Sequence, residues 1–207
     1  MRRRFLSVLL SLCLALGLLP TAAFAQGESY VALGDSITTG FGLSNDEQAF
    51  PKIIAEKYGY ELKNLSKSGA TSSDLLEVVQ ASENADALEN ADLITITIGG
   101  NDLMGALYQF LADAYNDANG TNISAADVQA ALTGTNQNIT QVGMLTFAAG
   151  VIGGFASSDA ATTALMEFGT NLSAIIAALY QANPDVTIIV ANQYNPYSYA
   201  AEEATGV

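Results

Sequence analysis

The stretch YVALGDSITTG, at residues 30–40, places a serine directly after an apolar run that ends in glycine and aspartate. A strand that runs into a tight turn can present a serine hydroxyl at the edge of a sheet, where it could act as a nucleophile. Histidine is the base that most often takes the proton of such a serine. The 207 residues contain no histidine. Ser36 is therefore a candidate nucleophile without a candidate base.

Two further short motifs share this context, because each of them follows a predicted strand. They are NLSKSGAT at residues 64–71 and IGGND at residues 98–102. Each motif taken singly is an ordinary turn or loop sequence. Since the carboxyl ends of parallel strands lie at one edge of a sheet, we expect the three motifs to meet there.

The elements that must position these motifs alternate between strand and helix. Strands are predicted at 29–33, 60–65, 92–98 and 186–191, and helices at 50–58, 73–80, 103–115, 124–132 and 162–181. The run DLITITI at 92–98 is apolar on both faces, which is typical of a strand buried in a parallel sheet. This order predicts an α/β protein, a three-layer α/β/α sandwich with a mainly parallel sheet.

A helical insertion is predicted at about residues 105–160, where the sequence is rich in Ala, Gly and Asn. It contains the apolar segment VGMLTFAAGVIGGFA at residues 142–156. This segment has two interpretations. It is either a lid or acyl-binding wall beside the site, or a helix that packs on the core.

Together, in this order, the three motifs resemble the sequence blocks of the SGNH hydrolases, the GDSL-type esterases and lipases. The resemblance aligns Ser36 with the family's nucleophile, Gly69 with the glycine of its second block and Asn101 with the asparagine of its third. Residues 168–196 are also similar to the helix and strand that precede the family's last strand. The resemblance implies a flavodoxin-like sandwich and a carboxylic-ester hydrolase that needs no cofactor.

The family resemblance also implies a role for each aligned residue. Attack on an ester carbonyl creates an oxyanion, which preorganised hydrogen-bond donors must stabilise. The implied donors are the backbone N–H groups of Ser36 and Gly69 and the side-chain amide of Asn101. The missing Cβ of Gly69 would permit close approach of the substrate. Asp35 is then an acid that supports the turn and not a member of a catalytic triad.

The family's base is a histidine in an Asp-x-x-His motif that follows a fifth strand. We expect this sequence to be truncated before that block, so that the last strand, the last helix and the histidine are absent together. Residues 26–207 would then be nearly inactive. A histidine-free binding module for an ester or glycan ligand remains the alternative. A carboxylate base is less attractive, because an unperturbed carboxylate accepts a serine proton poorly.

Other chemistries have less support in the sequence. It contains no Gly-x-Ser-x-Gly elbow, phosphate loop or dinucleotide-binding fingerprint. YNDANG at residues 115–120 is a poor calcium loop, because tyrosine holds the first ligand position and Ala126 stands where a glutamate belongs. With no histidine, and with the one cysteine at position 13, we expect no metal and no cofactor.

The first 25 residues are typical of a secretory signal peptide. Three arginines precede a leucine-rich run at residues 5–19, and Ala23-Phe24-Ala25 resembles a cleavage site. The run is shorter than the roughly 20 apolar residues of a membrane span. We therefore expect a secreted protein without a stable membrane anchor, in which residues 26–207 form one hydrolase domain.

The charge of the chain limits its partners. It has 21 acidic residues against 7 Lys and Arg, and no basic residue follows Lys67. This balance argues against nucleic acid and phosphate-rich ligands, although an acidic surface also serves solubility alone. The expected partner is a neutral small-molecule, lipid or glycan ester, bound by a monomer.

Overall fold

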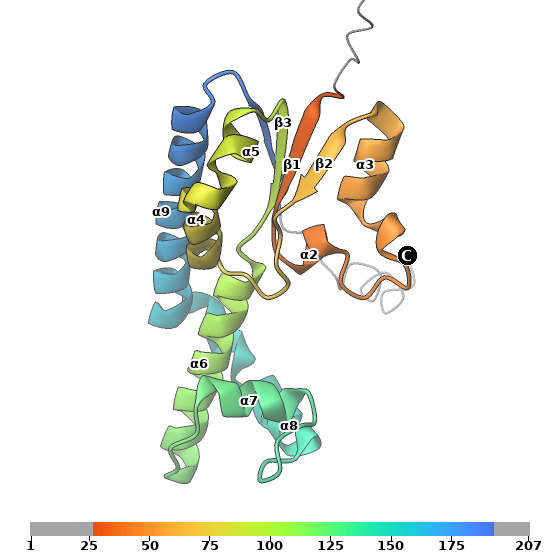
Figure 1. Cartoon of the computed structure of the whole chain (residues 1–207). Helices are drawn as coiled ribbons and strands as arrows, with labels where there is room; N and C mark the ends of the chain where they lie inside the picture. The colour runs from red at the N-terminus through yellow and green to blue at the C-terminus, as the bar shows by residue number, and fades with distance from the viewer. Residues whose placement is uncertain (1–26, 193–207) are drawn as a thin grey trace, which may run out of the picture.

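A computed structural model of the chain describes residues 27–192 (Figure 1). Within these residues, four parallel strands form one sheet in the order β2-β1-β3-β4. Their bounds are β1 Ser29–Gly34, β2 Glu61–Asn64, β3 Leu93–Thr97 and β4 Thr187–Val190. The predicted α/β sandwich with a mainly parallel sheet is confirmed. The predicted signal peptide and the last residues of the chain lie outside the described residues.

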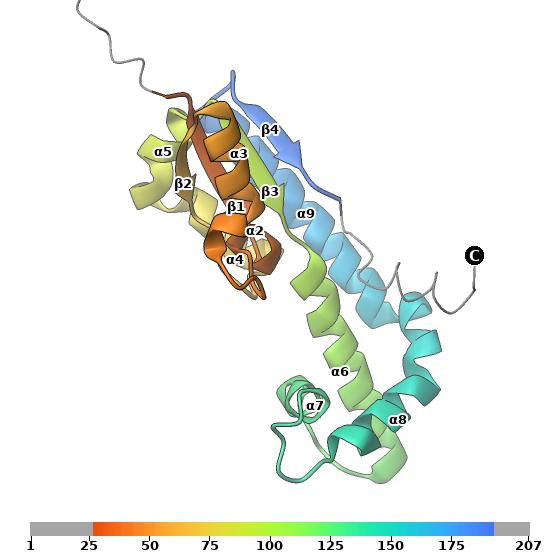
Figure 2. The same ribbon diagram turned by 90° about the vertical axis from the view of Figure 1, so that its right-hand side faces the viewer.

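Helices cover both faces of the sheet (Figures 1 and 2). The helices on one face are α4 Ser72–Gln80, α5 Ala85–Glu89 and α9 Asp159–Ala182, and α3 Phe50–Tyr58 lies on the other. Side chains of β1 alternate between these faces, as the pleat of a strand requires. Val31 and Leu33 pack with α4 and α9, whereas Tyr30 and Ala32 pack with α3.

A group of helices extends beyond the carboxyl ends of the strands (Figure 2). It consists of α6 Gly100–Asn119, α7 Ala125–Leu132, α8 Gln141–Val151 and the 3-10 helix η3 Ile152–Ser157. These helices have a hydrophobic cluster of their own, in which Leu111, Val128 and Met144 are fully buried. The apolar segment at 142–156 thus packs on this second cluster and not on the core of the sheet.

Two helices begin three residues earlier than the sequence pattern predicts. Helix α6 begins at Gly100 and not at residue 103, because its N-cap is Gly99, which has no side chain to signal a cap. Helix α9 begins at Asp159 and not at residue 162, where Ser158 caps it by accepting the backbone N–H of Ala161. The earlier start of α6 places Asn101 in a helical turn instead of a loop.

Among the described residues, α9 is long and apolar enough to cross a membrane by length and composition alone. In the structure this helix lies against the sheet. Its Ile175 and Leu179 are fully buried in the main hydrophobic cluster. One face of α9 thus packs on the sheet.

Candidate active site

The turn after β1 is held tightly against the end of β3. Gly34 has φ +136°, and a Cβ at this position would lie 2.2 Å from the backbone oxygen of Thr97. The backbone N–H of Asp35 donates to the same oxygen over 3.0 Å. Only glycine fits at residue 34, so this position brings the end of β1 into contact with β3.

Asp35 is 3% exposed, and its carboxylate is committed to the turn. Its Oδ1 accepts the backbone N–H of Ile37 over 3.0 Å and the hydroxyl of Thr97 over 2.9 Å. The first of these bonds caps the short helix α2 Ser36–Thr39. Asp35 thus supports the turn, which agrees with the role expected from the sequence.

Ser36 is the first residue of α2 and is partly exposed. Neither its Oγ nor its backbone N–H forms a hydrogen bond with any residue in the described range 27–192. The hydroxyl can therefore approach a substrate carbonyl, and the N–H can donate to a ligand. These are the two groups that a serine hydrolase needs from its nucleophile.

The loop between β2 and α4 is tied to the turn that carries Ser36. The backbone N–H of Lys67 donates to the oxygen of Gly34 over 2.9 Å. The hydroxyls of Thr39 and Ser68 are 2.8 Å apart. The loop is thus fixed beside α2 immediately before Gly69.

Gly69 is exposed and has φ +83°, a left-handed conformation that favours glycine. An added Cβ would meet no protein atom within 4 Å. The backbone conformation therefore favours glycine here, and the close approach of a substrate to Gly69 stays a prediction. The backbone N–H of Gly69 has no partner among the described residues and can donate to a ligand.

Asn101 lies in the first turn of α6 and points back to the same loop. Its Nδ2 donates to the backbone oxygen of Ala70 over 2.8 Å. A side-chain amide carries two N–H donors, so one of them remains for a ligand. The bond to Ala70 fixes the direction of the amide next to Gly69.

A second polar cluster, centred on Asp102, joins α4 to α6 and α9. The carboxylate of Asp102 accepts the backbone N–H of Ser72 over 3.0 Å and the hydroxyl of Ser72 over 2.5 Å. The Nδ2 of Asn171 donates to the same hydroxyl over 3.0 Å. Sequence reasoning missed this cluster, for which the only signal was that Asp102 stands next to Asn101.

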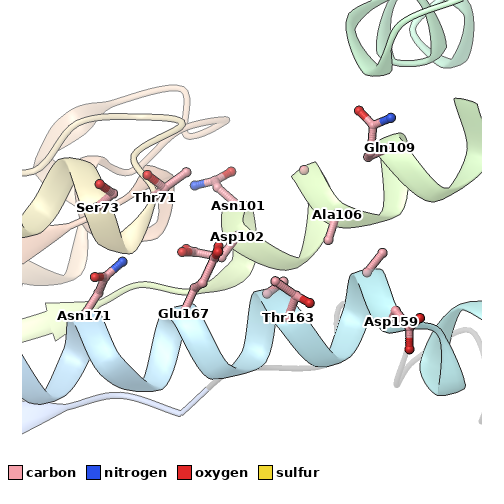
Figure 3. A pocket seen from close by; sticks show the side chains of 13 residues that line it. Thr71, Ser73, Asn101, Asp102, Ala106, Gln109, Asp159, Thr163, Glu167 and Asn171 are labelled. Carbon is pink, nitrogen blue, oxygen red and sulfur yellow. The ribbon is translucent and has the colours of Figure 1, made fainter. Parts of the chain in front are cut away.

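A groove of about 570 Å³ begins at Asn101 and runs between α6 and α9 (Figure 3). Its walls include the small residues Gly105, Ala106 and Ala164. Ser36 and Gly69 do not line this groove.

The groove is acidic. Asp102, Asp159 and Glu167 line it, and no basic residue does. Such a surface repels anionic ligands. Within residues 27–192, no three His, Cys, Asp or Glu side chains are grouped closely enough to hold a metal ion.

Helix α4, which follows the loop after β2, begins with a capping box formed by Thr71 and Asp74. The hydroxyl and backbone N–H of Thr71 both donate to the carboxylate of Asp74. The bond from the Thr71 hydroxyl has the larger effect and the bond from its backbone N–H the smaller. Together they hold the pKa of Asp74 below its ordinary value. The cap fixes the point at which the loop ends and α4 begins.

The chain belongs to the GDSL-like lipase/acylhydrolase family, whose model matches residues 32–206. This result confirms the resemblance to the SGNH hydrolases that the three motifs carry. The family is one of lipases and acylhydrolases. The roles of the individual residues rest on the geometry described above.

Two curated relatives share part of the sequence. The spore germination lipase LipC of Bacillus licheniformis is 34% identical over 84 residues, which cover 38% of this chain and 40% of the relative. The protein YpmR of Bacillus subtilis strain 168 is 34% identical over 85 residues, covering 38% of this chain and 33% of the relative. The matches thus span less than half of either relative.

A crystal structure of the lipase Lip_vut3 from a goat rumen metagenome has the same fold. It superposes with a TM-score of 0.51 at 21% sequence identity, over 86% of this chain and 71% of that chain. At this identity the likeness shows the fold alone.

Proposed function

We propose that the protein is a secreted serine esterase or lipase that hydrolyses neutral carboxylic esters through Ser36. The observation that carries the proposal is the set of hydrogen bonds that joins the three motifs. Thr39 and Ser68 tie the Ser36 turn to the Gly69 loop, and Asn101 holds that loop through Ala70. Three sequence segments thus converge where the strands end.

The proposed reaction uses Ser36 as the nucleophile. Its Oγ forms a bond to the ester carbonyl carbon while a base takes the hydroxyl proton, and the carbonyl oxygen becomes an oxyanion. The backbone N–H groups of Ser36 and Gly69 and the amide of Asn101 donate to that oxyanion. Expulsion of the alcohol, which takes up the proton, leaves an acyl-serine that water then hydrolyses.

We propose that the base is a histidine outside the 207 residues, because none of them is histidine. In a serine protease, loss of the nucleophile or of the base lowers kcat on the order of 10⁶-fold. Residues 26–207 by themselves are therefore expected to be nearly inactive. If the natural protein has no such histidine, the alternative is a binding module for an ester or glycan ligand.

The acidic groove supports a neutral substrate over an anionic one. Lipid, aryl and acetyl-glycan esters all satisfy this condition. The arginine and leucine pattern of residues 1–25 supports export, and a monomer is the simplest form of the protein.

Hydrolysis of an uncharged aryl ester by the complete gene product tests the proposal. We expect turnover that Ser36→Ala abolishes. Ser173→Ala is the matched control, since Ser173 lies on an exposed face of α9 and bonds only to the backbone oxygen of Gly169. Tight binding of an ester analogue without any turnover would favour the binding module, and turnover that survives Ser36→Ala would refute the assignment of Ser36.

A further inference from the structure

Helix α8 carries apolar side chains beyond its buried face. Its inner face carries Met144, which is fully buried in the second hydrophobic cluster, and Ala148. On the outer face, Val142 is 73% exposed and Leu145 is 50% exposed, and Ile152 in the following turn is 49% exposed. At 100° per residue Val142 and Leu145 lie about 60° apart on one side of α8, and Ile152 follows at its C-cap.

This outer face also lies in the longest uncharged part of the described chain. No charged residue occurs between Asp127 and Asp159, although the protein carries a net charge of −14. Isolated exposed apolar side chains are ordinary, but three that share one uncharged face indicate an interaction surface. The partner of this face therefore has an apolar surface and needs no charged contacts.

The position of α8 connects this surface to the candidate site. Helices α7 and α8 pack at the end of α6 that is remote from the sheet (Figure 2). The groove along α6 and α9 extends from Asn101 to Asp159, and Asp159 follows the 3-10 helix η3 that continues α8 (Figure 3). If α8 contacts a surface, a molecule that leaves this surface is close to the groove. The groove then leads it to Asn101.

We propose that the outer face of α8, defined by Val142, Leu145 and Ile152, docks on a lipid surface without net charge. An interfacial helix binds through apolar burial plus attraction between basic residues and anionic lipids. The face supplies the apolar part only, and the acidic protein is repelled by an anionic surface. Zwitterionic lipid is therefore the fitting partner. This inference goes beyond the proposed ester hydrolysis and does not depend on turnover.

A single tryptophan reports directly on this contact, because the chain has none. We would introduce Leu145→Trp into the full chain and record its emission with phosphatidylcholine vesicles, with and without brominated acyl chains. Tyr58→Trp is the matched control. Tyr58 is 65% exposed and ends α3 next to the amino end of β2, at the end of the sheet that is remote from α8 (Figure 1). The emission of a tryptophan reports on the surroundings of that residue alone. Binding through α8 therefore changes the emission at position 145, whereas binding through residues 5–19 does not.

The proposal predicts a blue shift and quenching by brominated lipid at position 145 and neither at position 58. Adding Val142→Asn and Ile152→Asn should lower the vesicle partition coefficient by about tenfold or more. If Leu145→Trp does not fold, Val142→Trp serves as the reporter. Unshifted emission at α8, equal quenching at both positions, or tighter binding to anionic vesicles would overturn the proposal. A blue shift that needs no vesicles and grows with protein concentration would instead assign the face to a second copy of the chain.

Discussion

The side-chain amide of Asn101 donates to the backbone oxygen of Ala70 over 2.8 Å, and this bond places the amide beside Gly69. The two residues lie 31 positions apart, on a loop after β2 and in the first turn of α6. The bond uses one of the two N–H groups of the amide and fixes its orientation. The second N–H can still donate to a ligand. The candidate oxyanion site is thus built from a side chain and the loop that it holds.

Replacement of Asn101 by alanine should therefore affect catalysis more than stability. Loss of one oxyanion donor lowers kcat by roughly 10²–10³, whereas loss of one ordinary hydrogen bond costs only about 1 kcal/mol of folding free energy. Steady-state kinetics of the complete gene product and urea unfolding would measure the two effects. Unchanged kcat in a folded Asn101→Ala variant would remove Asn101 from the oxyanion site.

Gly34→Ala tests the contact between β1 and β3. The new Cβ would lie 2.2 Å from the oxygen of Thr97, and the strand cannot move away without breaking the bond from Asp35. We expect a loss of more than about 3 kcal/mol of folding free energy, measured by chemical unfolding.

Gly42→Ala is the control for that experiment. Gly42 also has a positive φ, +87°, but an added Cβ meets nothing within 4 Å. We therefore expect Gly42→Ala to lose only about 1–2 kcal/mol of folding free energy, which is the cost of backbone strain. Equal losses in the two alanine variants would show that the contact with Thr97 has no energetic role.

Asp102 and Ser72 should be energetically coupled. Removing the carboxylate leaves the buried N–H and hydroxyl of Ser72 without their acceptor, which costs roughly 1–3 kcal/mol. A double-mutant cycle of Asp102→Ala and Ser72→Ala, followed by urea unfolding, measures this coupling. Additive losses would mean that the cluster does not act as a unit.

The cap of α4 predicts a specific dependence of stability on pH. The pKa of Asp74 is lowered in the folded protein, so its ionised form stabilises the fold at pH values above its ordinary pKa of 3.8. That contribution is lost as the pH falls through the lowered folded value. Asp74→Asn should flatten this part of the curve of unfolding free energy against pH. An identical acid limb in the variant would contradict the capping account.

The sheet could be predicted from sequence because each strand has a local signal, such as the doubly apolar run of β3. The three motifs could be placed on one edge because parallel strands align their carboxyl ends. The Asp102 cluster could not be predicted, since Ser72 and Asn171 meet it only through tertiary packing. The start of α6 at Gly100 could not be predicted either, because a glycine N-cap gives no side-chain signal.

The central claim is that Ser36 is the nucleophile of an ester hydrolase. Its most direct test is to treat the complete gene product with a fluorophosphonate, which bonds covalently to an activated serine, and to map the adduct by mass spectrometry of peptides. The account predicts one adduct, on the peptide that contains Ser36, and none in Ser36→Ala. A folded protein that remains unlabelled at Ser36, or that is labelled at another serine, would contradict it.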